Sequence, residues 1–485
     1  MNILFIDIDT LRPDHMGCYG YNRNTTPNMD RIAKEGIRFN NYYCSDAPCL
    51  PSRACLVSGM LGIHNGTVGH GGTAADRRSM GCERGFMDEN FNNSLWHIFR
   101  KSGMKTASIS TFPERHSAYW FNAGFNEMYN VGGCGSELGE QVLPVALDWL
   151  DNNSDNWFLH LHLWDPHTPY RAPADFGNPF ENQPLENWID DDTLKKHLTH
   201  VGPHSINELY MYNSEEMKEF PRQPGSANDL DGVKKIFDGY DCGIRYADEM
   251  IGKVFDKLKA LNIYDQTAVI ITSDHGENMG ELGIYCEHAT ADYATCHIPM
   301  IIKWPNVKAG YIDEELHYNI DLAPTLAELM QIAPYKKWDG LSYAETIVGG
   351  KAEGHDYLVL SQMAHVCQRS VRFGDWLYMR TYHDGLHLFD KEMLFNIKKD
   401  PHEQQNVIDE NETIRLKGAK YLLDWVDNMM AISDSTVDPM WVVLKEGGPF
   451  HCRGYLDMYC ERLIKTGRTQ GAEKLRKRRE NGWMF

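Results

Sequence analysis

The chain has 485 residues, of which 42% are hydrophobic and 11% aromatic, so it can fill one large core or two unequal cores. Lys+Arg number 48 and Asp+Glu 68, and the formal net charge of −20 argues against a general nucleic-acid binder, because phosphate backbones are held by basic surfaces. No segment approaches the roughly 18–20 consecutive apolar residues of a membrane span, so we expect a soluble protein without a membrane partner.

The N-terminal sequence and the spacing of the cysteines indicate a cytoplasmic protein. Residues 1–10 carry Asp7 and Asp9 and lack the basic start, apolar stretch and small-residue cleavage site of a secretion signal. The 12 cysteines are scattered and do not form the dense framework of a small secreted domain. We therefore expect reduced thiols and a cytoplasmic location.

Short apolar strands alternate with helices along most of the chain. Asn2–Ile8 reads as a buried strand, and Thr26 followed by Pro27 marks the start of a helix. The pattern predicts further helices near 94–102 and 229–261, and strands near 106–110, 157–163, 268–272 and 299–303. This alternation predicts an α/β fold with a mostly parallel sheet covered by helices on both faces.

Two later regions depart from this pattern. Residues 171–225 read as a long loop or insertion of the kind that often shapes a binding site. Residues 370–380 and 386–389 look like antiparallel strands joined by a turn at 383–385, which indicates a smaller C-terminal subdomain. We expect two parts, 1–352 and 353–485, and read the basic run 474–479 as a solvated helix end.

The strongest local signal for chemistry is the sequence from Cys49 to Arg53, CLPSR. Pro51 suits a first helical turn and Gly59 a helix end, so Cys49 should lie at a helix N-terminus, where backbone N–H groups favour an anion. Arg53, four residues on, can share a face with Cys49 and offer a guanidinium to a tetrahedral oxyanion. A cysteine at a helix start is, taken alone, more often a small buried side chain.

Acidic residues follow two predicted strands. Asp7 and Asp9 lie two apart at one strand end, and Asp274 and His275 follow the strand at 268–272. Strand ends of a parallel sheet meet at its carboxyl edge, where ligands bind in open α/β folds. Carboxylates gathered around an anion site need a cation between them, although any single Asp can instead cap a loop.

Histidines are the candidate proton donors. His160 and His162 alternate with apolar residues and point to one face, so each can be a hydrogen-bonded core residue. His167 lies past the strand end, after Asp165 and Pro166, and an imidazole there could protonate a leaving group near neutral pH.

Cys49–Arg53 followed by a glycine-terminated helix resembles the signature of the type I, formylglycine-dependent sulfatases of the alkaline phosphatase superfamily. The match covers every fixed position of that signature. The resemblance continues in order along the chain, at 2–43, 158–170, 272–283 and 394–407.

The resemblance implies an alkaline-phosphatase-like catalytic domain followed by a C-terminal α+β subdomain with an antiparallel sheet. It also implies that a formylglycine-generating maturation enzyme oxidises Cys49 to an aldehyde, whose hydrate is the nucleophile. A divalent cation would be held by Asp9, Asp274, His275 and modified Cys49, and Asp7 would compensate for Thr10, which stands where the family usually has an acid or amide. Oxygen-rich ligands favour calcium, with manganese or magnesium as alternatives.

The resemblance also suggests substrate contacts. His167 matches a sulfate-contacting histidine, while the lysine expected after Asp274 and His275 is absent and Glu287 or His288 stands near its place. A second expected Lys-x-His is replaced by a stretch containing Arg115 and His116, which we take as substitutes. His70 is a further candidate for the pocket lining.

The implied reaction is hydrolysis of a sulfate monoester, with a histidine protonating the departing alcohol. The loop-rich insertion with Trp188 suits a sugar ring, so we expect a sulfated carbohydrate, with exo-action on a glycosaminoglycan-derived oligosaccharide as one form. The alternatives are a phosphonate monoester or phosphodiester hydrolase, an aryl or choline sulfatase, and a noncatalytic binding protein on the same scaffold.

Overall fold

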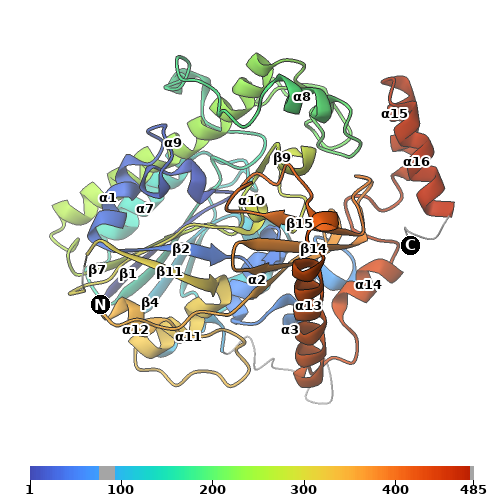
Figure 1. Cartoon of the computed structure of the whole chain (residues 1–485). Coiled ribbons are helices and arrows are strands. Elements are labelled where there is room, and N and C mark those ends of the chain that lie inside the picture. Colours follow the sequence, from blue (N-terminus) through green and yellow to red (C-terminus); the bar gives the residue numbers. More distant parts are fainter. Residues whose placement is uncertain (76–92, 308, 481–485) are drawn as a thin grey trace.

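A computed structural model describes residues 1–75, 93–307 and 309–480 (Figure 1). Its centre is an eight-stranded sheet in the order β11-β2-β10-β7-β1-β6-β4-β5. Every neighbouring pair is parallel except those of β10, which runs antiparallel to β2 and β7. The strands are β1 (Asn2–Ile8), β2 (Ile37–Tyr43), β4 (Lys105–Ile109), β5 (Glu127–Tyr129), β6 (Trp157–Leu163), β7 (Thr267–Thr272), β10 (Met300–Lys303) and β11 (Tyr311–Tyr318).

Side chains of the central strand alternate between two apolar cores. Ile3 and Phe5 face one core, and Leu4, Ile6 and Ile8 face the other. The second core is covered by α1 (Pro27–Glu35), α7 (Gly139–Asp151) and α9 (Leu230–Ala260). The first is covered by α2 (Cys49–Ser58), α5 (Leu95–Lys101), α11 (Leu322–Leu329) and α12 (Ala344–Ile347). The predicted α/β sheet with helices on both faces is confirmed.

The C-terminal region holds a five-stranded sheet in the order β15-β14-β13-β12-β3. Its strands are β3 (Asp46–Ala47), β12 (Leu358–Gln362), β13 (Cys367–Phe373), β14 (Trp376–His383) and β15 (Glu392–Asn396). Because β3 comes from the segment directly before α2, this sheet is tied to the start of the Cys49 helix. The division at residue 352 stays a prediction.

The predicted hairpin of this sheet has its turn near the right place but both strands wrong. The predicted strand 370–380 is interrupted by a turn at Gly374 and Asp375, where Gly374 has φ +52°. The predicted turn at 383–385 lies where β14 ends and the loop to its antiparallel neighbour β15 begins. Residues 386–389 form no strand, because Leu386 and Leu388 have φ of 74° and 60°, outside the β region. The outer strand is β15 instead.

Irregular segments and C-terminal helices complete the described chain. Residues 171–225 are mostly loop, as predicted, with α8 (Asp191–Leu198) within them, and the Trp188 ring stacks on His402 with centroids 4.1 Å apart. The remaining longer helices are α13 (Glu412–Ile432), α14 (Pro439–Lys445), α15 (Leu456–Lys465) and α16 (Thr469–Glu480). Helix α13 stands beside β14, and the pair α15–α16 lies to one side (Figure 1).

Candidate active site

Helix α2 places the predicted nucleophile. It begins at Cys49 and ends at Ser58, and all ten residues are buried. Gly59 takes the left-handed conformation, φ +65°, and its N–H donates to the carbonyl of Cys55 at 2.8 Å, closing the helix as a glycine can. Pro51 lies in the first turn. Cys49 is only 1% exposed, at the helix N-terminus, as predicted.

Four buried side chains form a group that fits a divalent cation. Asp9, Cys49, Asp274 and His275 each offer one ligand atom, and these atoms lie within 4.8 Å of one another. Cys49 Sγ lies 3.1 Å from His275 Nε2. Asp9 Oδ1 is buried without a hydrogen-bond partner among the described residues, as expected of an atom reserved for a metal. Two carboxylates and an imidazole suit calcium, manganese or magnesium.

Arg53 is buried beside this group and contacts the carboxylates of Asp7, Asp9 and Asp274. Its Nη1 donates to Asp9 at 3.1 Å and to Asp274, and its Nε donates to Asp7 at 3.1 Å. Burial opposes ionisation of Asp7, but Arg53, His160 and His162 together outweigh burial and lower the pKa of Asp7 to about 2. Asp7 lies outside the four-residue group, so its role as a ligand stays a prediction.

Thr10 has an unusual backbone beside the group. Its φ is 62°, a conformation that β-branched residues rarely adopt. Its N–H donates to Asp274 Oδ1 at 3.3 Å, and its carbonyl accepts the Tyr240 hydroxyl at 2.6 Å. Two hydrogen bonds therefore hold this strained residue against the cation group, as is common at functional sites.

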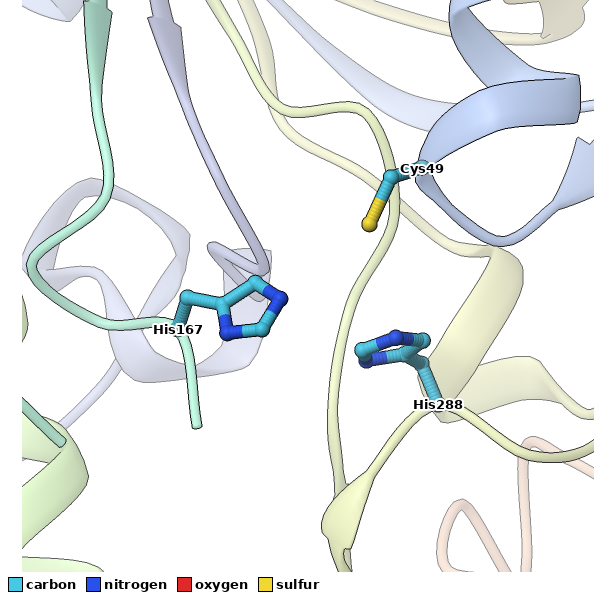
Figure 2. Close-up of side chains that lie close together, drawn as sticks. All are labelled: Cys49, His167 and His288. Carbon is cyan, nitrogen blue, oxygen red and sulfur yellow. The ribbon is translucent and has the colours of Figure 1, made fainter. Parts of the chain in front are cut away.

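Two predicted histidines face the nucleophile. His167 and His288 each bring a ring nitrogen within a 4.8 Å group with Cys49 Sγ, and Figure 2 shows both rings beside the thiol. His167 Nε2 lies 3.9 Å from Asp9 Oδ1. His288 is held between Glu277, 3.3 Å from its Nδ1, and Glu287, 2.9 Å from its Nε2. Despite burial, Glu287 raises the pKa of His288 well above its ordinary value.

The remaining predicted contacts surround the same space. The rings of His70 and His116 lie 5.1 Å apart, and His70 Nδ1 is 3.0 Å from a nitrogen of His451. Arg115 is exposed, and its guanidinium lies 5.1 Å from the ring centre of Trp164. Trp164 also packs against Arg53 and His167, so Arg115 borders the site through one aromatic ring.

Neighbouring histidines change the ionisation of the Cys49 thiol. Burial alone would raise the pKa of Cys49, but His275, His116 and His167 lower it well below the ordinary value. The pocket is therefore built to hold negative charge at residue 49. This is the electrostatic requirement of an oxyanion nucleophile and of a bound oxyanion ester.

The sequence did not predict every residue of the site. It gave His162 only a possible role in the core, and it gave no role to His365 and His451. His162 Nε2 lies 2.7 Å from Arg53 Nη2, while its Nδ1 bonds Ser110 at 2.9 Å, so it is both a core residue and a partner of the site. His365 and His451 come from the C-terminal region, and form with His70 a group of ring nitrogens within 4.8 Å. Only the tertiary fold joins such distant segments, so periodicity gave no signal for them.

Asp165 is expected to make stability depend on pH. Burial raises its pKa to about 7, against the opposing effects of the Gly139 N–H, which it accepts at 2.9 Å, and Arg171. The pKa of Asp165 is higher in the folded state than in the unfolded chain, so the unfolded chain loses its proton first as the pH rises. The stabilising contribution of the protonated side chain is therefore complete below about pH 4 and is lost as the pH rises through 7. Asp165→Asn cannot ionise, so between pH 5 and 8 wild type should lose about 2–3 kcal/mol relative to the variant. Urea unfolding of both proteins at the two pH values measures this, and equal losses would contradict a protonated Asp165.

Two family models match the chain. The one described as Sulfatase matches residues 1–332, and the one described as N-sulphoglucosamine sulphohydrolase, C-terminal, matches residues 280–421. An N-acetylglucosamine-6-O-sulfatase of Bacteroides thetaiotaomicron is 24% identical, over 85% of this chain and 83% of that protein.

Solved structures share the fold. One, described as in complex with its substrate D-glucosamine-2-N,6-O-disulfate, has a TM-score of 0.69 at 19% identity, covering 90% of this chain and 99% of the other. A phosphonate monoester hydrolase of Agrobacterium radiobacter has a TM-score of 0.67 at 19% identity, covering 92% and 99%. Among the described residues, none of the helices has the length and apolar character needed to span a bilayer.

Proposed function

Since the chain belongs to the sulfatase family and is a sulfuric ester hydrolase, we propose that it removes sulfate from a sulfated carbohydrate. The observation that carries this proposal is the cation group of Asp9, Cys49, Asp274 and His275, with Cys49 at the start of a buried helix. Two similar proteins, the N-acetylglucosamine-6-O-sulfatase and the structure described as in complex with D-glucosamine-2-N,6-O-disulfate, support a sugar substrate. A glycosaminoglycan-derived oligosaccharide that loses sulfate from its terminal sugar is the form we favour.

The same residues would provide the two cofactors of the reaction, a formylglycine and a divalent cation. A maturation enzyme would convert Cys49 to formylglycine, and Asp9, Asp274 and His275 would hold calcium, with manganese or magnesium as alternatives. The hydrated aldehyde supplies a nucleophile that can expel sulfate again, and the cation supplies charge stabilisation. The cysteines in the described chain are free thiols, which supports the cytoplasmic location that the sequence predicts.

Side chains of the protein would bind the sulfate ester and protonate the alcohol that leaves. The Arg53 guanidinium and the N-terminus of α2 stabilise negative charge on the ester oxygens. His167 and His288 both lie beside residue 49 (Figure 2). His288, whose pKa Glu287 raises, is the donor of a proton to the departing alcohol that we favour, while His167, whose pKa burial lowers to about 4, would contact the sulfate as a neutral ring. His116, His70 and Arg115 border this space and contact the rest of the substrate.

A substrate panel tests the proposal. Matured enzyme should hydrolyse defined sulfated mono- and disaccharides with a higher kcat/KM than aryl sulfate, choline sulfate, phosphonate monoesters or phosphodiesters. A preference for the phosphorus esters would replace the proposal with a phosphonate monoester or phosphodiester hydrolase on this fold. A preference for aryl or choline sulfate would retain the reaction and overturn the sugar substrate.

Metal removal should weaken both activity and stability. EDTA leaves the carboxylates of Asp9 and Asp274 with Arg53 as their main positive partner, so hydrolysis should stop. A ligand that binds only the folded state at 100 times its Kd stabilises by about 2.7 kcal/mol, and the unfolding midpoint should fall accordingly. Calorimetry and turnover, each with calcium, magnesium or manganese added back, measure this. Full activity in excess EDTA would contradict the cation site.

A further inference from the structure

Three imidazoles from distant parts of the chain meet outside the catalytic cation group, and we call them the three-histidine group. His70 follows α3 (Gly62–Asn65), His365 lies in the turn between β12 and β13, and His451 follows α14. One ring nitrogen of each lies within 4.8 Å of the other two. His70 and His451 are only partly buried, so an ion can reach the group from the solvent.

The spacing of these nitrogens is close to that around a tetrahedral metal ion. His70 Nδ1 lies 3.0 Å from His451 Nε2, and the ring of His365 stacks on that of His451 with centroids 4.2 Å apart. Zinc binds imidazole nitrogens at about 2.0–2.1 Å, which separates two nitrogens of a tetrahedral site by about 3.3 Å. Small movements of the three side chains would therefore bring three nitrogens onto one ion.

The three rings are neutral at pH 7, so each has a lone pair to offer. Burial lowers the pKa of His70 to about 3, that of His451 to about 4 and that of His365 well below its ordinary value. His70 Nε2 is buried and has no hydrogen-bond partner among the described residues, although buried ring nitrogens normally bind a proton partner, a water or a metal. Glu287 Oε1 lies 3.7 Å from His365 Nε2, and its charge would balance part of a cation's. Neutral imidazoles select zinc and similar transition metals over calcium or magnesium.

The fold holds the three segments together without a metal. The His451 N–H donates at 3.0 Å to the carbonyl of Ala364, the residue before the second histidine. Beside the first histidine, a Cβ on Gly71 would lie 2.2 Å from the Phe450 ring, so only glycine lets this segment pack so closely on the residue before His451. Because the ligands are already assembled, binding an ion would need little further ordering of the chain.

We propose that the three-histidine group binds a second metal ion, which its ligand type identifies as zinc, separate from the catalytic cation. The ion would join the segment that follows α3 to two segments of the C-terminal region, and water would complete its coordination. The proposal goes beyond the proposed function, because it holds whichever ester the enzyme hydrolyses.

Zinc binding to the full-length chain with unmodified Cys49 tests the proposal, the metal being counted by elemental mass spectrometry after dialysis. The catalytic group also has ligands for zinc, so wild type should hold up to two ions per chain. Asp274→Asn should remove the catalytic ion and keep the other. His451→Gln in that background should weaken zinc binding at least about 100-fold, since even the loss of an outer-shell partner costs roughly 10–100-fold.

His402→Gln is the matched control in the same background, because His402 is a partly exposed histidine that pairs with Glu281 outside the group. It should leave zinc binding unchanged, and circular dichroism checks that each variant folds. Loss of all zinc in Asp274→Asn, or equal zinc affinity in its His451→Gln and His402→Gln forms, would overturn the proposal.

X-ray absorption of zinc-loaded Asp274→Asn identifies the ligands without a further variant. Zinc at the three-histidine group should show nitrogen neighbours at about 2.0–2.1 Å with the outer-shell pattern of imidazole. A sulfur neighbour at about 2.3 Å would place the ion at Cys49 and overturn the proposal. Assays on sulfated sugars report separately on the proposed function, because a failure to hydrolyse them leaves the zinc count unchanged.

Discussion

Cys49→Ala should lower kcat for sulfate esters at least about 10⁴-fold, the scale of loss when a covalent nucleophile is removed. The thiol is 1% exposed at the N-terminus of α2, and 3.1 Å from His275 in the cation group. Alanine lacks the thiol group through which the β-carbon of cysteine is oxidised to the aldehyde, and leaves the neighbouring side chains in place. Steady-state kinetics on the sulfated sugar that wild type prefers measures the loss.

Two further variants make the result specific. Cys49→Ser keeps a hydroxyl at the same place, but a plain alcohol that forms the sulfate ester cannot eliminate sulfate from it, so multiple turnover should still be absent. Cys134→Ala removes an exposed free thiol and should leave kcat unchanged. Undiminished turnover in Cys49→Ala would contradict the covalent scheme.

Arg53→Met should destabilise the metal-free protein by about 3–5 kcal/mol, the usual cost of removing one partner from buried charges. Arg53 is fully buried and bonds Asp7, Asp9 and Asp274, so the variant leaves three carboxylates without their cation. Urea unfolding in EDTA measures the free energy of unfolding. Hydrolysis should be lost as well, because the guanidinium stabilises the ester oxygens.

Added calcium should recover part of the stability of Arg53→Met, since a bound cation supplies the charge that the guanidinium supplied. It should not restore hydrolysis. Arg100→Met, an exposed residue on α5, is the matched control, and should change stability by less than about 0.5 kcal/mol. A loss below about 1 kcal/mol in Arg53→Met would show that the buried carboxylates do not depend on this side chain.

Local sequence signals predicted the central sheet and the helix of the nucleophile. The apolar run of β1 and the proline and glycine that bound α2 act within a few residues, so their effects can be read from the chain itself. Asp9, Asp274 and His275 could be grouped because they follow strands that end at one edge of a parallel sheet.

Features set by distant contacts were harder to predict. Strand β2 carries Arg38, Asn40 and Asn41, whose polarity hid a strand that the neighbouring β10 and β11 stabilise. The turn between β13 and β14 uses only Gly374 and Asp375, so the sequence read these two strands as one, at 370–380. His365 and His451 reach the site only because the C-terminal sheet packs against α2 through β3.

The most direct test of the account measures turnover of the sulfated sugar against the fraction of molecules in which residue 49 is converted. Conversion of cysteine to formylglycine lowers the mass by roughly 18 Da, so mass spectrometry of each preparation gives that fraction. Preparations matured to different extents should show a kcat per mole of protein that rises in proportion to the fraction and extrapolates to zero. Equal turnover by fully unconverted protein would contradict the oxidised nucleophile on which the account rests.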